Sequence, residues 1–434
     1  MKPRKVLALL VSLVMLGTLF AGCKSSSSQS SSETTNAAPQ TITFYGGWTG
    51  ADQGTMQSLV TKFNESQSSI KVQFTSLQWT LIFAKFMTDC AAGNPPDVLA
   101  MHSFEMGQFA NMGVLDLSAI KELNFKKSDY NDLAWNGTIY KGSQYAIPLD
   151  INMDALYYNK DMFASAGIKT PPVTGDDLIA DAQSLTVDKN GKHPNETGFD
   201  ANNIKTYGLG FEMNQHVFFQ AFALLNQQGN KPFSDTMTSV KLDIPKTAKA
   251  FQFIEDLIFK YKTVPVGEKS AVDDFKAGSI AMMIDGNWQL SALASSSLNW
   301  ATTPYPNVFG QKGVWGASEV LTVPLRKTAN AAKKKAAETF IKWISDNSVD
   351  WAQSGQLPAN KAALEKAKSL VGRQAFIDEL SYVHFLPANT KSTQLFSSVA
   401  PSPIRTASDD AMLNDKDPTA IANQMETDMN AILK

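Results

Sequence analysis

Histidine, cysteine, serine and carboxylate side chains do most enzymatic bond chemistry, so their spacing is the first test of function. The chain has four histidines, and none is spaced as a metal-binding pair. It contains no G-x-S-x-G elbow, H-E-x-x-H zinc helix, Walker-type phosphate loop or complete G-x-G-x-x-G motif. A glycosidase pair stays open, because its two carboxylates can be far apart in a sequence. We expect no catalytic residue, metal or cofactor, and we expect that the protein is not an enzyme.

Two short segments resemble a metal site or a reactive thiol, and their neighbours argue against both. Asp188-Lys189-Asn190-Gly191 is similar to the middle of a calcium loop, but Thr186 and Thr197 stand where carboxylates are expected. A surface hairpin is therefore predicted there. Cys90 lies in an apolar helical context, which favours a buried, unreactive thiol.

The N-terminus has the pattern of a signal peptide. Three cations, Lys2, Arg4 and Lys5, precede an apolar run that ends in Leu19-Phe20-Ala21-Gly22-Cys23. The run has about fifteen residues, whereas a membrane-spanning helix needs roughly 20. The last five residues resemble a bacterial lipobox, although Phe20 stands where Leu is usual; the alternative is ordinary cleavage before an incidental cysteine. We expect a signal peptide at 1–22 and lipidation of Cys23, for example with palmitate.

A Ser-rich segment at 23–40 is too polar to bury a core and is predicted to be a flexible tether. Such a chain spans roughly 20–25 Å root-mean-square. Removal of the signal peptide takes three cations and changes the formal net charge from −2 to −5, so nucleic acid is not an expected partner. The expected location is the extracellular face of a bacterial cytoplasmic membrane, reached through the lipid only, and the tether favours a Gram-positive envelope.

Strands and helices alternate along the rest of the chain, and its 434 residues are enough for two domains. This alternation predicts an α/β fold of mostly parallel sheets covered by helices. Thr174 and Asp177 have the spacing of a capping box ahead of a helix at 178–185. Strands are expected at 42–44, 70–74, 97–101, 145–149, 207–211, 280–284 and 320–325, and other helices at 56–63, 248–258 and 332–344.

Three segments follow the lipobox in a fixed order. They are Ala91-Ala92-Gly93-Asn94-Pro95-Pro96-Asp97-Val98, Tyr145-Ala146-Ile147-Pro148-Leu149-Asp150 with Leu156-Tyr157-Tyr158-Asn159-Lys160-Asp161-Met162-Phe163, and Phe275-Lys276-Ala277-Gly278-Ser279-Ile280-Ala281-Met282-Met283 leading to Asp285-Gly286-Asn287-Trp288. In this order they resemble the family 1 extracellular solute-binding proteins, which include maltose-binding protein and other sugar receptors of ABC importers. The resemblance covers nearly all of 41–434 and implies a two-lobed, type II periplasmic-binding-protein-like fold, with the ligand cleft at the hinge.

The resemblance also implies a function and a division into lobes. The function is binding of an oligosaccharide by lobe closure and its delivery to the transmembrane permease subunits of an ABC importer, by a monomer. A receptor of the same fold for a non-sugar solute and a lipid-anchored glycoside hydrolase are the alternatives. By analogy the chain crosses between lobes near 146–153, 299–305 and 354–361. Lobe 1 is then 41–148 plus 305–356, and lobe 2 is 149–304 plus 357–434.

A sugar offers hydroxyl groups to polar side chains and an apolar C–H face to aromatic rings. Open α/β sheets bind ligands beyond the carboxyl ends of their strands. Trp48 follows the first strand, and Ser103 and Phe104 follow the third. The resemblance matches Trp288 to the stacking tryptophan of lobe 2 and Asp150 to an acidic ligand contact. The alternative for Asp150 is a carboxylate that braces the hinge.

The other expected ligand contacts rest on the resemblance alone or on residue type. Trp315 lies in a loop where relatives often contact ligand, and Asn152 accompanies Asp150. For the remaining candidates, packing in the core is an equal alternative. These are Glu212, Tyr382, Phe385 and Trp79.

Overall fold

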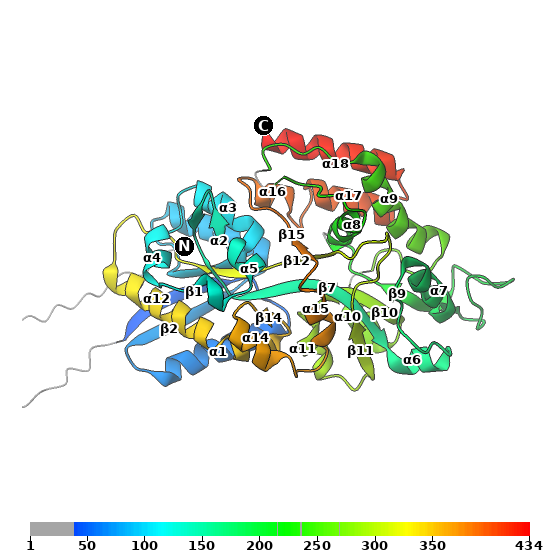
Figure 1. The fold of residues 1–434 in the computed structure, drawn as a ribbon, viewed down its shortest axis with the longest axis horizontal. Helices are drawn as coiled ribbons and strands as arrows, with labels where there is room; N and C mark the ends of the chain where they lie inside the picture. The colour runs from blue at the N-terminus through cyan, green and yellow to red at the C-terminus, as the bar shows by residue number, and fades with distance from the viewer. Residues whose placement is uncertain (1–38, 215, 235–236, 269) are drawn as a thin grey trace, which may run out of the picture. The chain divides into compact units, whose positions relative to one another are not determined.

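The computed structural model describes residues 39–434 except 215, 235–236 and 269, and it has a two-lobed α/β fold (Figure 1). Cys23 and most of the expected tether lie outside the described residues, so the lipobox stays a prediction. Within the described part of the chain, no helix is long and apolar enough to cross a membrane. Each lobe is built on its own sheet.

The sheet of lobe 1 has the strand order β2-β1-β3-β13-β6. Strand β1 runs parallel to β2 and β3, whereas β13 is antiparallel to its neighbours β3 and β6. Because the three parallel strands end at one edge of the sheet, the residues that follow them meet there. The strands are β1 Gln40–Gly46, β2 Ile70–Ser76, β3 Val98–His102, β6 Ile147–Pro148 and β13 Glu319–Thr322.

Helices cover this sheet with the apolar side that their sequences predict. In α1 (Asp52–Ser66) the buried residues are Met56, Leu59, Val60 and Phe63, which confirms the predicted helix and its spacing. The remaining elements of lobe 1 are α2 Trp79–Ala91, α3 Ser103–Asn111, α4 Leu117–Glu122, α5 Asp132–Asn136, α12 Ala331–Asp346 and α13 Ser348–Trp351, with the short pair β4 Ile139–Tyr140 and β5 Ser143–Gln144.

Strand β7 (Asp150–Asn159) is the central strand of the lobe 2 sheet. All of its residues except Tyr158 are buried, because it is paired on both edges. β10 pairs with residues 154–158 of β7, β11 with 156–159, β12 with 152–153 and β14 with 150–151. The other strands are β8 Val187–Asp188, β9 Ile204–Gly210, β10 Ile280–Gly286, β11 Trp300–Thr303, β12 Val314–Ala317, β14 Leu357–Pro358 and β15 Val383–Phe385.

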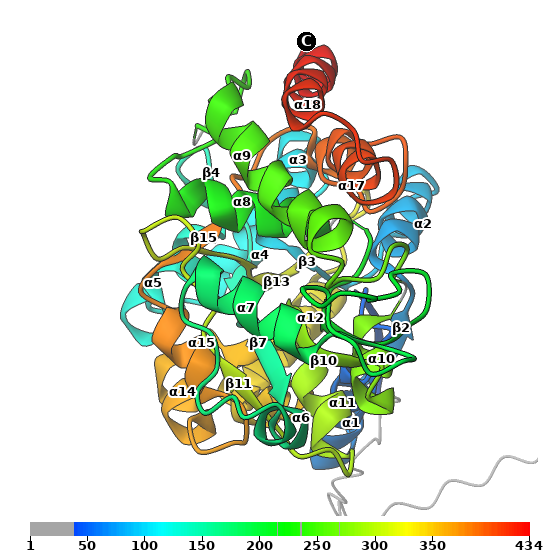
Figure 2. The ribbon, with the colours of Figure 1, turned by 90° about the vertical axis from the view of Figure 1, so that its right-hand side faces the viewer.

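The predicted capping box opens α7 (Gly175–Leu185): the Thr174 hydroxyl accepts from the Asp177 N–H, and the Asp177 carboxylate accepts from the Thr174 N–H. Helices α8 (His216–Gln227), α9, α17 and α18 gather on one side of lobe 2 (Figures 1 and 2). The other helices are α6 Lys160–Ser165, α9 Ile244–Glu255, α10 Ala271–Ala277, α11 Gln289–Ala294, α14 Lys361–Ala367, α15 Gln374–Glu379, α16 Ser392–Leu395, α17 Pro403–Leu413 and α18 Pro418–Leu433.

The second crossing between the sheets differs from the expected position at 299–305. Strand β12 still pairs with β7, so the chain returns to lobe 1 at Ser318, between β12 and β13. The prediction was wrong because the segment before β12 bonds to lobe 2. There the Asn307 N–H donates to the Val173 carbonyl, and the Gln227 side chain donates to the Pro306 carbonyl. The boundary of lobe 1 at 305 moves accordingly.

The first crossing joins β6 to β7. For the third, β14 already pairs with β7 while the residues after β14 still contact lobe 1, so both positions stay predictions. The Ala359 carbonyl accepts from the Asn131 N–H, and Lys361 Nζ donates to the Ser128 carbonyl, so this stretch still contacts lobe 1. The Gly372 carbonyl accepts from Thr302 of β11. The rest of the division into lobes stays a proposal.

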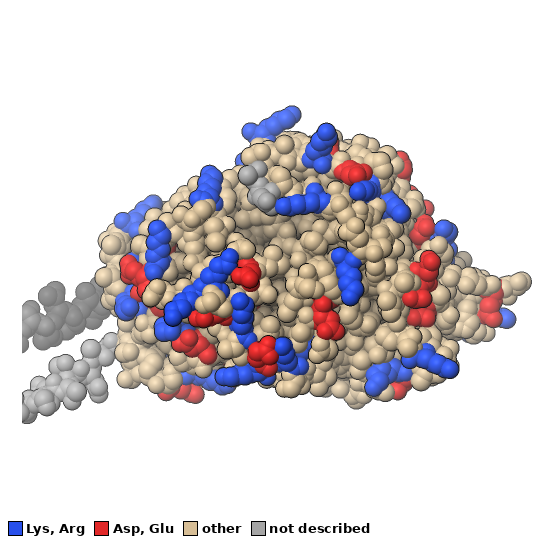
Figure 3. Space-filling model, in the orientation of Figure 1, with Lys and Arg blue, Asp and Glu red and all other residues tan. Residues whose placement is uncertain are grey.

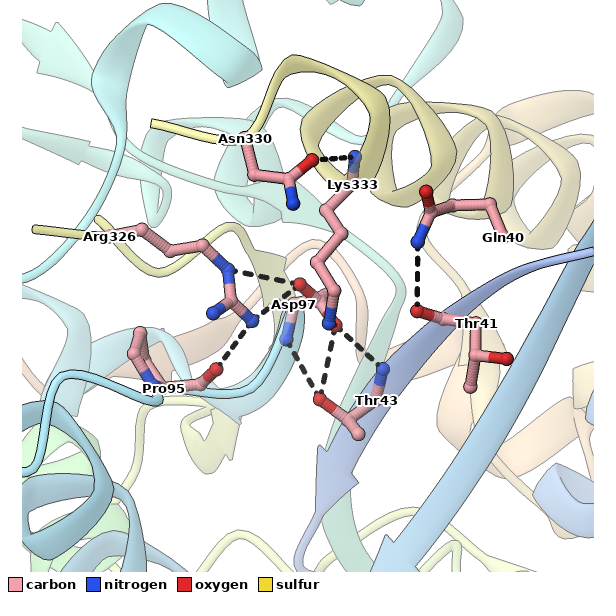
Figure 4. A network of polar contacts seen from close by, with 8 residues as sticks. All are labelled: Gln40, Thr41, Thr43, Pro95, Asp97, Arg326, Asn330 and Lys333. Atoms are coloured by element: carbon pink, nitrogen blue, oxygen red, sulfur yellow. Dashed lines mark hydrogen bonds and ion pairs between the residues drawn. The ribbon is translucent and has the colours of Figure 1, made fainter. Parts of the chain in front are cut away.

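A buried carboxylate fastens the core of lobe 1 together (Figure 4). Asp97, just before β3, accepts from the Arg326 guanidinium through Oδ1. Its Oδ2 accepts from the Thr43 N–H at 2.9 Å and from Lys333 Nζ at 3.1 Å. Because these partners come from β1, from α12 and from the segment between β13 and α12, one side chain joins four segments of the lobe.

Candidate functional site

Three tryptophans meet beside the carboxyl ends of β1 and β2. Trp48 follows β1 and is buried, with its ring centroid 5.5 Å from that of Trp79 and 5.1 Å from that of Trp351. A Cβ on Gly47 would lie 1.8 Å from the Trp79 ring, so this close approach requires glycine. The structure thus brings Trp48 and Trp79 together, in tight packing.

Asp150 joins the crossing segments of the hinge. Its Oδ1 accepts from the Glu319 N–H at 2.9 Å, and its Oδ2 accepts from Trp351 Nε1 at 2.6 Å. Burial raises the pKa of Asp150, and burial together with the Asp150 charge raises the pKa of Glu319 well above its ordinary value. Since both oxygens of Asp150 have partners inside the protein, the geometry matches the alternative of a carboxylate that braces the hinge.

One face of β7 and β12 carries three buried polar side chains. Gly316 pairs with Met153 and Ala317 with Asn152, so the antiparallel register sets Trp315 beside Asp154. The side chains of Asn152, Asp154 and Trp315 therefore share a face. Each has a buried polar atom without a partner among the described residues: Asn152 Oδ1, Asp154 Oδ1 and Trp315 Nε1. Buried polar groups are normally hydrogen-bonded, so this face has hydrogen-bonding capacity that no described residue uses.

Aromatic rings lie against this face. Trp315 stacks on Phe219 with ring centroids 3.9 Å apart and planes at 4°. Trp288 is half-buried, and its ring centroid lies 6.4 Å from that of Trp315 and 5.5 Å from that of His216. A Cβ on Gly286 would lie 2.0 Å from the Trp288 ring, so the ring covers this glycine, which pairs with Asp154. Trp288 is thereby placed over the polar face.

Asn287 fixes the position of Trp288. Its N–H donates to the Met153 carbonyl at 3.1 Å, and its Nδ2 donates to the Ile151 carbonyl at 3.0 Å. These bonds extend the pairing of β10 with β7 by one residue and tie the turn to the hinge strand. The three residues therefore act together. Gly286 leaves space for the Trp288 ring, Asn287 ties the turn to β7, and Trp288 lies over the polar face.

Carboxyl groups dominate the ionisable side chains near this face. Glu212, after β9, is half-buried and accepts from Asn214. Burial, followed by the Glu212 charge, raises the pKa of Asp285 well above its ordinary value. Burial alone raises the pKa of Asp154 to about 8, and burial raises the pKa of Asp52 to about 6. Among the described residues, none of these carboxylates forms an ion pair with Lys or Arg.

Four of the predicted site residues lie elsewhere. Ser103 and Phe385 line a cavity of about 1190 Å³ between the α5–β4 segment of lobe 1 and the β15 segment of lobe 2. The Tyr382 ring lies under Lys312 Nζ, 5.2 Å away, and Phe104 packs in the core against Phe396.

The elements that line this cavity, β4, α5 and β15, lie on the opposite side of the molecule from α2 and α10 (Figure 2). The face in Figure 3 is hollowed, and Lys and Arg side chains lie beside the hollow. The structure therefore brings Asn152, Trp288 and Trp315 together, with Glu212 nearby, and does not bring Ser103, Tyr382 and Phe385 to them.

Sequence reasoning missed Asp154. It drew attention to Asp150 because a carboxylate interrupted an apolar strand, and Asp154 interrupts the same strand four residues later. The same pattern could have identified it. His216 and Asp52 carried no comparable pattern, because each lies at the start of a helix where polar residues are common.

Residues 58–372 match the family model of the bacterial extracellular solute-binding proteins. The chain belongs to this family. It is 25% identical over 257 residues to the maltotriose-binding protein of Pyrococcus abyssi, a match that covers 59% of this chain and 52% of the relative. The chain thus spans about half the length of that protein. It is 26% identical over 332 residues to the maltodextrin-binding protein MdxE of Bacillus subtilis, with 72% of each chain covered.

Solved structures share the fold of this family member. The GacH receptor of Streptomyces glaucescens, solved unliganded and with acarbose, matches with a TM-score of 0.77 at 20% identity, over 92% of this chain and 99% of that one. The resemblance drawn from the sequence and the two-lobed α/β fold that it implied are therefore confirmed.

Proposed function

We propose that this solute-binding protein captures an extracellular oligosaccharide between its lobes and delivers it to the permease subunits of an ABC importer. One observation carries the proposal: Trp288 and Trp315 lie over a face where Asn152 and Asp154 have unpartnered, buried polar atoms. Aromatic rings stack on the C–H faces of sugars, and the polar atoms need a hydrogen-bonding ligand. The sugar ligands in the names of the two curated relatives support this class of solute.

The lobes close on the solute, and the importer distinguishes the closed, loaded form from the open, empty form. Three chain segments connect the sheets, which is the construction of a hinge with limited modes of motion. Shifting an open form to a closed one, from 1:99 to 99:1, takes roughly 5.5 kcal/mol of differential binding. Contacts from both lobes are needed for this, so Trp48 and Asp52 of lobe 1 are proposed to face the solute held by Trp288 in lobe 2.

The same proposal includes the location of the protein. Cys23, after signal-peptide cleavage, would carry the lipid that holds a monomer at the outer face of a Gram-positive membrane. The lipobox-like sequence and the Ser-rich tether support this. Replacing Cys23 by Ser is expected to abolish incorporation of labelled palmitate and to release the protein into the medium; retained labelling would contradict it.

Binding without conversion is the testable core of the proposal. Residues 39–434 are screened by thermal shift against neutral oligosaccharides, and a ligand at 100 times its Kd should add about 2.7 kcal/mol of stability. We expect Trp288→Ala to weaken the best hit by about thirtyfold or more, and Trp343→Ala, a half-buried tryptophan on α12, to leave it unchanged. Overnight incubation and product analysis must show intact sugar. Cleavage beyond stoichiometry would establish the glycoside hydrolase instead.

A further inference from the structure

Asp154 is a carboxylate in the middle of a buried strand, and its Oδ1 has no hydrogen-bond partner among the described residues. The side chains of Asp154 and Asn152 are each 3% exposed, and that of Trp315 is 4% exposed. Asn152 and Asp154 are two positions apart on one strand, so both oxygens lie on the face that Trp288 covers. Among the described residues, the buried and unpartnered polar atoms on β7 therefore include two oxygens that can accept a hydrogen bond.

The ionisable neighbours of Asp154 are mostly other carboxyl groups. Asp285 on β10 and Glu379 on α15 both interact electrostatically with Asp154, and burial is the main cause that raises the pKa of each. His216 adds no positive charge, because burial lowers its pKa. Tyr157 and Tyr305 complete the neighbourhood, and burial raises the pKa of both.

Arg373 is a described cation that interacts with a neighbour of Asp154. Arg373 interacts with Tyr157, but its guanidinium donates to the carbonyls of Val371 and Ala352 and, among the described residues, to no carboxylate. A buried carboxylate is costly unless it is paired, and no described residue pairs with Asp154, so a cation that enters with the ligand would favour its ionised form.

A ligand ammonium group matches both the acceptor oxygens of Asn152 and Asp154 and the tryptophan rings that lie over them. An ammonium group has only hydrogen-bond donors, which suits two acceptor oxygens. A cation is also attracted to the faces of tryptophan rings, and the ring centroids of Trp288 and Trp315 lie 6.4 Å apart. Resting on the proposed function, we infer that the solute contains a protonated amino group, as an amino sugar does, and that Asp154 and Asn152 bind this group beneath Trp288.

Binding of the amino group is expected to release a proton from Asp154. Burial raises the pKa of Asp154 to about 8, so at pH 6.5 the carboxyl of the free protein is protonated. An adjacent ammonium favours the carboxylate, so the carboxyl proton passes to the buffer as the ion pair forms. We expect release of close to one proton for each amino sugar bound at pH 6.5.

Sugars that differ only in the amino group test the inference. Residues 39–434 are titrated calorimetrically at pH 6.5 with the β-1,4 trimer of glucosamine and with cellotriose, and with galactosamine and galactose. Two buffers of different ionisation enthalpy report the protons released. In the pairs that bind, we expect the amino member to bind at least tenfold more tightly. Asp154→Asn should remove this preference and the proton release.

A second buried acid provides the matched control. Burial also raises the pKa of Glu255 to about 8, but Glu255 lies on α9, with Asp415 and Asp417 among its neighbours. Glu255→Gln should leave the preference and the proton release unchanged. Tighter or equal binding of the neutral member would overturn the inference and leave the proposed function standing, as would an amino preference that survives Asp154→Asn. If no sugar of the pairs or of the neutral panel binds, both the inference and the proposed function fall.

Discussion

Removing the Asp150 carboxyl is expected to weaken the junction between the lobes. Asp150→Ala leaves the Glu319 N–H and Trp351 Nε1 buried without their acceptor, at the point where the crossing segments meet. A buried donor left unsatisfied costs about 1–3 kcal/mol, which sums to about 2–6 kcal/mol for two. Burial raises the pKa of Asp150, so relief of its desolvation offsets part of this loss. We therefore expect the free energy of unfolding to fall by about 2–4 kcal/mol at pH 7.

Equilibrium urea unfolding of residues 39–434, followed by far-UV circular dichroism, measures this change. Asp150→Asn keeps one acceptor oxygen and should lose about half as much. The control is Asp350→Ala, which removes a surface ion pair with Lys62 whose side chains are 41% and 58% exposed, and which should cost under about 1 kcal/mol. If Asp150→Ala costs no more than this control, the two buried hydrogen bonds do not stabilise the hinge and the argument is wrong.

Three further substitutions follow from the geometry. Gly286→Ala places a Cβ 2.0 Å from the Trp288 ring, so the ring must move; sugar affinity measured by calorimetry should fall at least about tenfold, and unchanged affinity would separate Trp288 from the site. Asp97→Ala leaves Arg326 and Lys333 without their buried partner and should lower the free energy of unfolding in urea by about 3–5 kcal/mol, in contrast to a loss under 1 kcal/mol for a surface acid. Burial raises the pKa of Glu255 in the folded state to about 8, so between about pH 4.5 and 8 the folded state binds more protons than the unfolded state, and the free energy of unfolding falls as pH rises. Glu255→Gln should make the free energy of unfolding less dependent on pH in this range. An unchanged slope would contradict this reasoning.

Features that depend on neighbours in the sequence were predictable. The spacing of Met56, Leu59, Val60 and Phe63 places them on one side of a helix whatever that helix packs against. The Thr174 capping box closes within one turn of the chain. The turn that carries Trp288 was also identified from a local pattern, because glycine, asparagine and tryptophan act together over three residues.

Features that depend on distant partners were not predictable. Asp150 and Asp154 interrupt the same apolar strand, and only their partners distinguish them. The N–H groups that donate hydrogen bonds to the Asp150 carboxylate come from Glu319 and Trp351, which are 169 and 201 residues away in the chain. The pairing of β12 with β7 likewise joins segments that no local pattern relates, which is why the second crossing was expected too early.

The amino-acid sequence by itself determined the class of fold, several of its strands and helices, the family and the tryptophans worth testing, because periodicity, capping and short motifs act over a few residues. Only the tertiary structure decided which of the two carboxylates has both oxygens hydrogen-bonded inside the protein. The physical reason is that a buried carboxylate is defined by what fills its hydrogen-bonding positions. For Asp150 the protein fills them, and for Asp154 Oδ1 no described residue does.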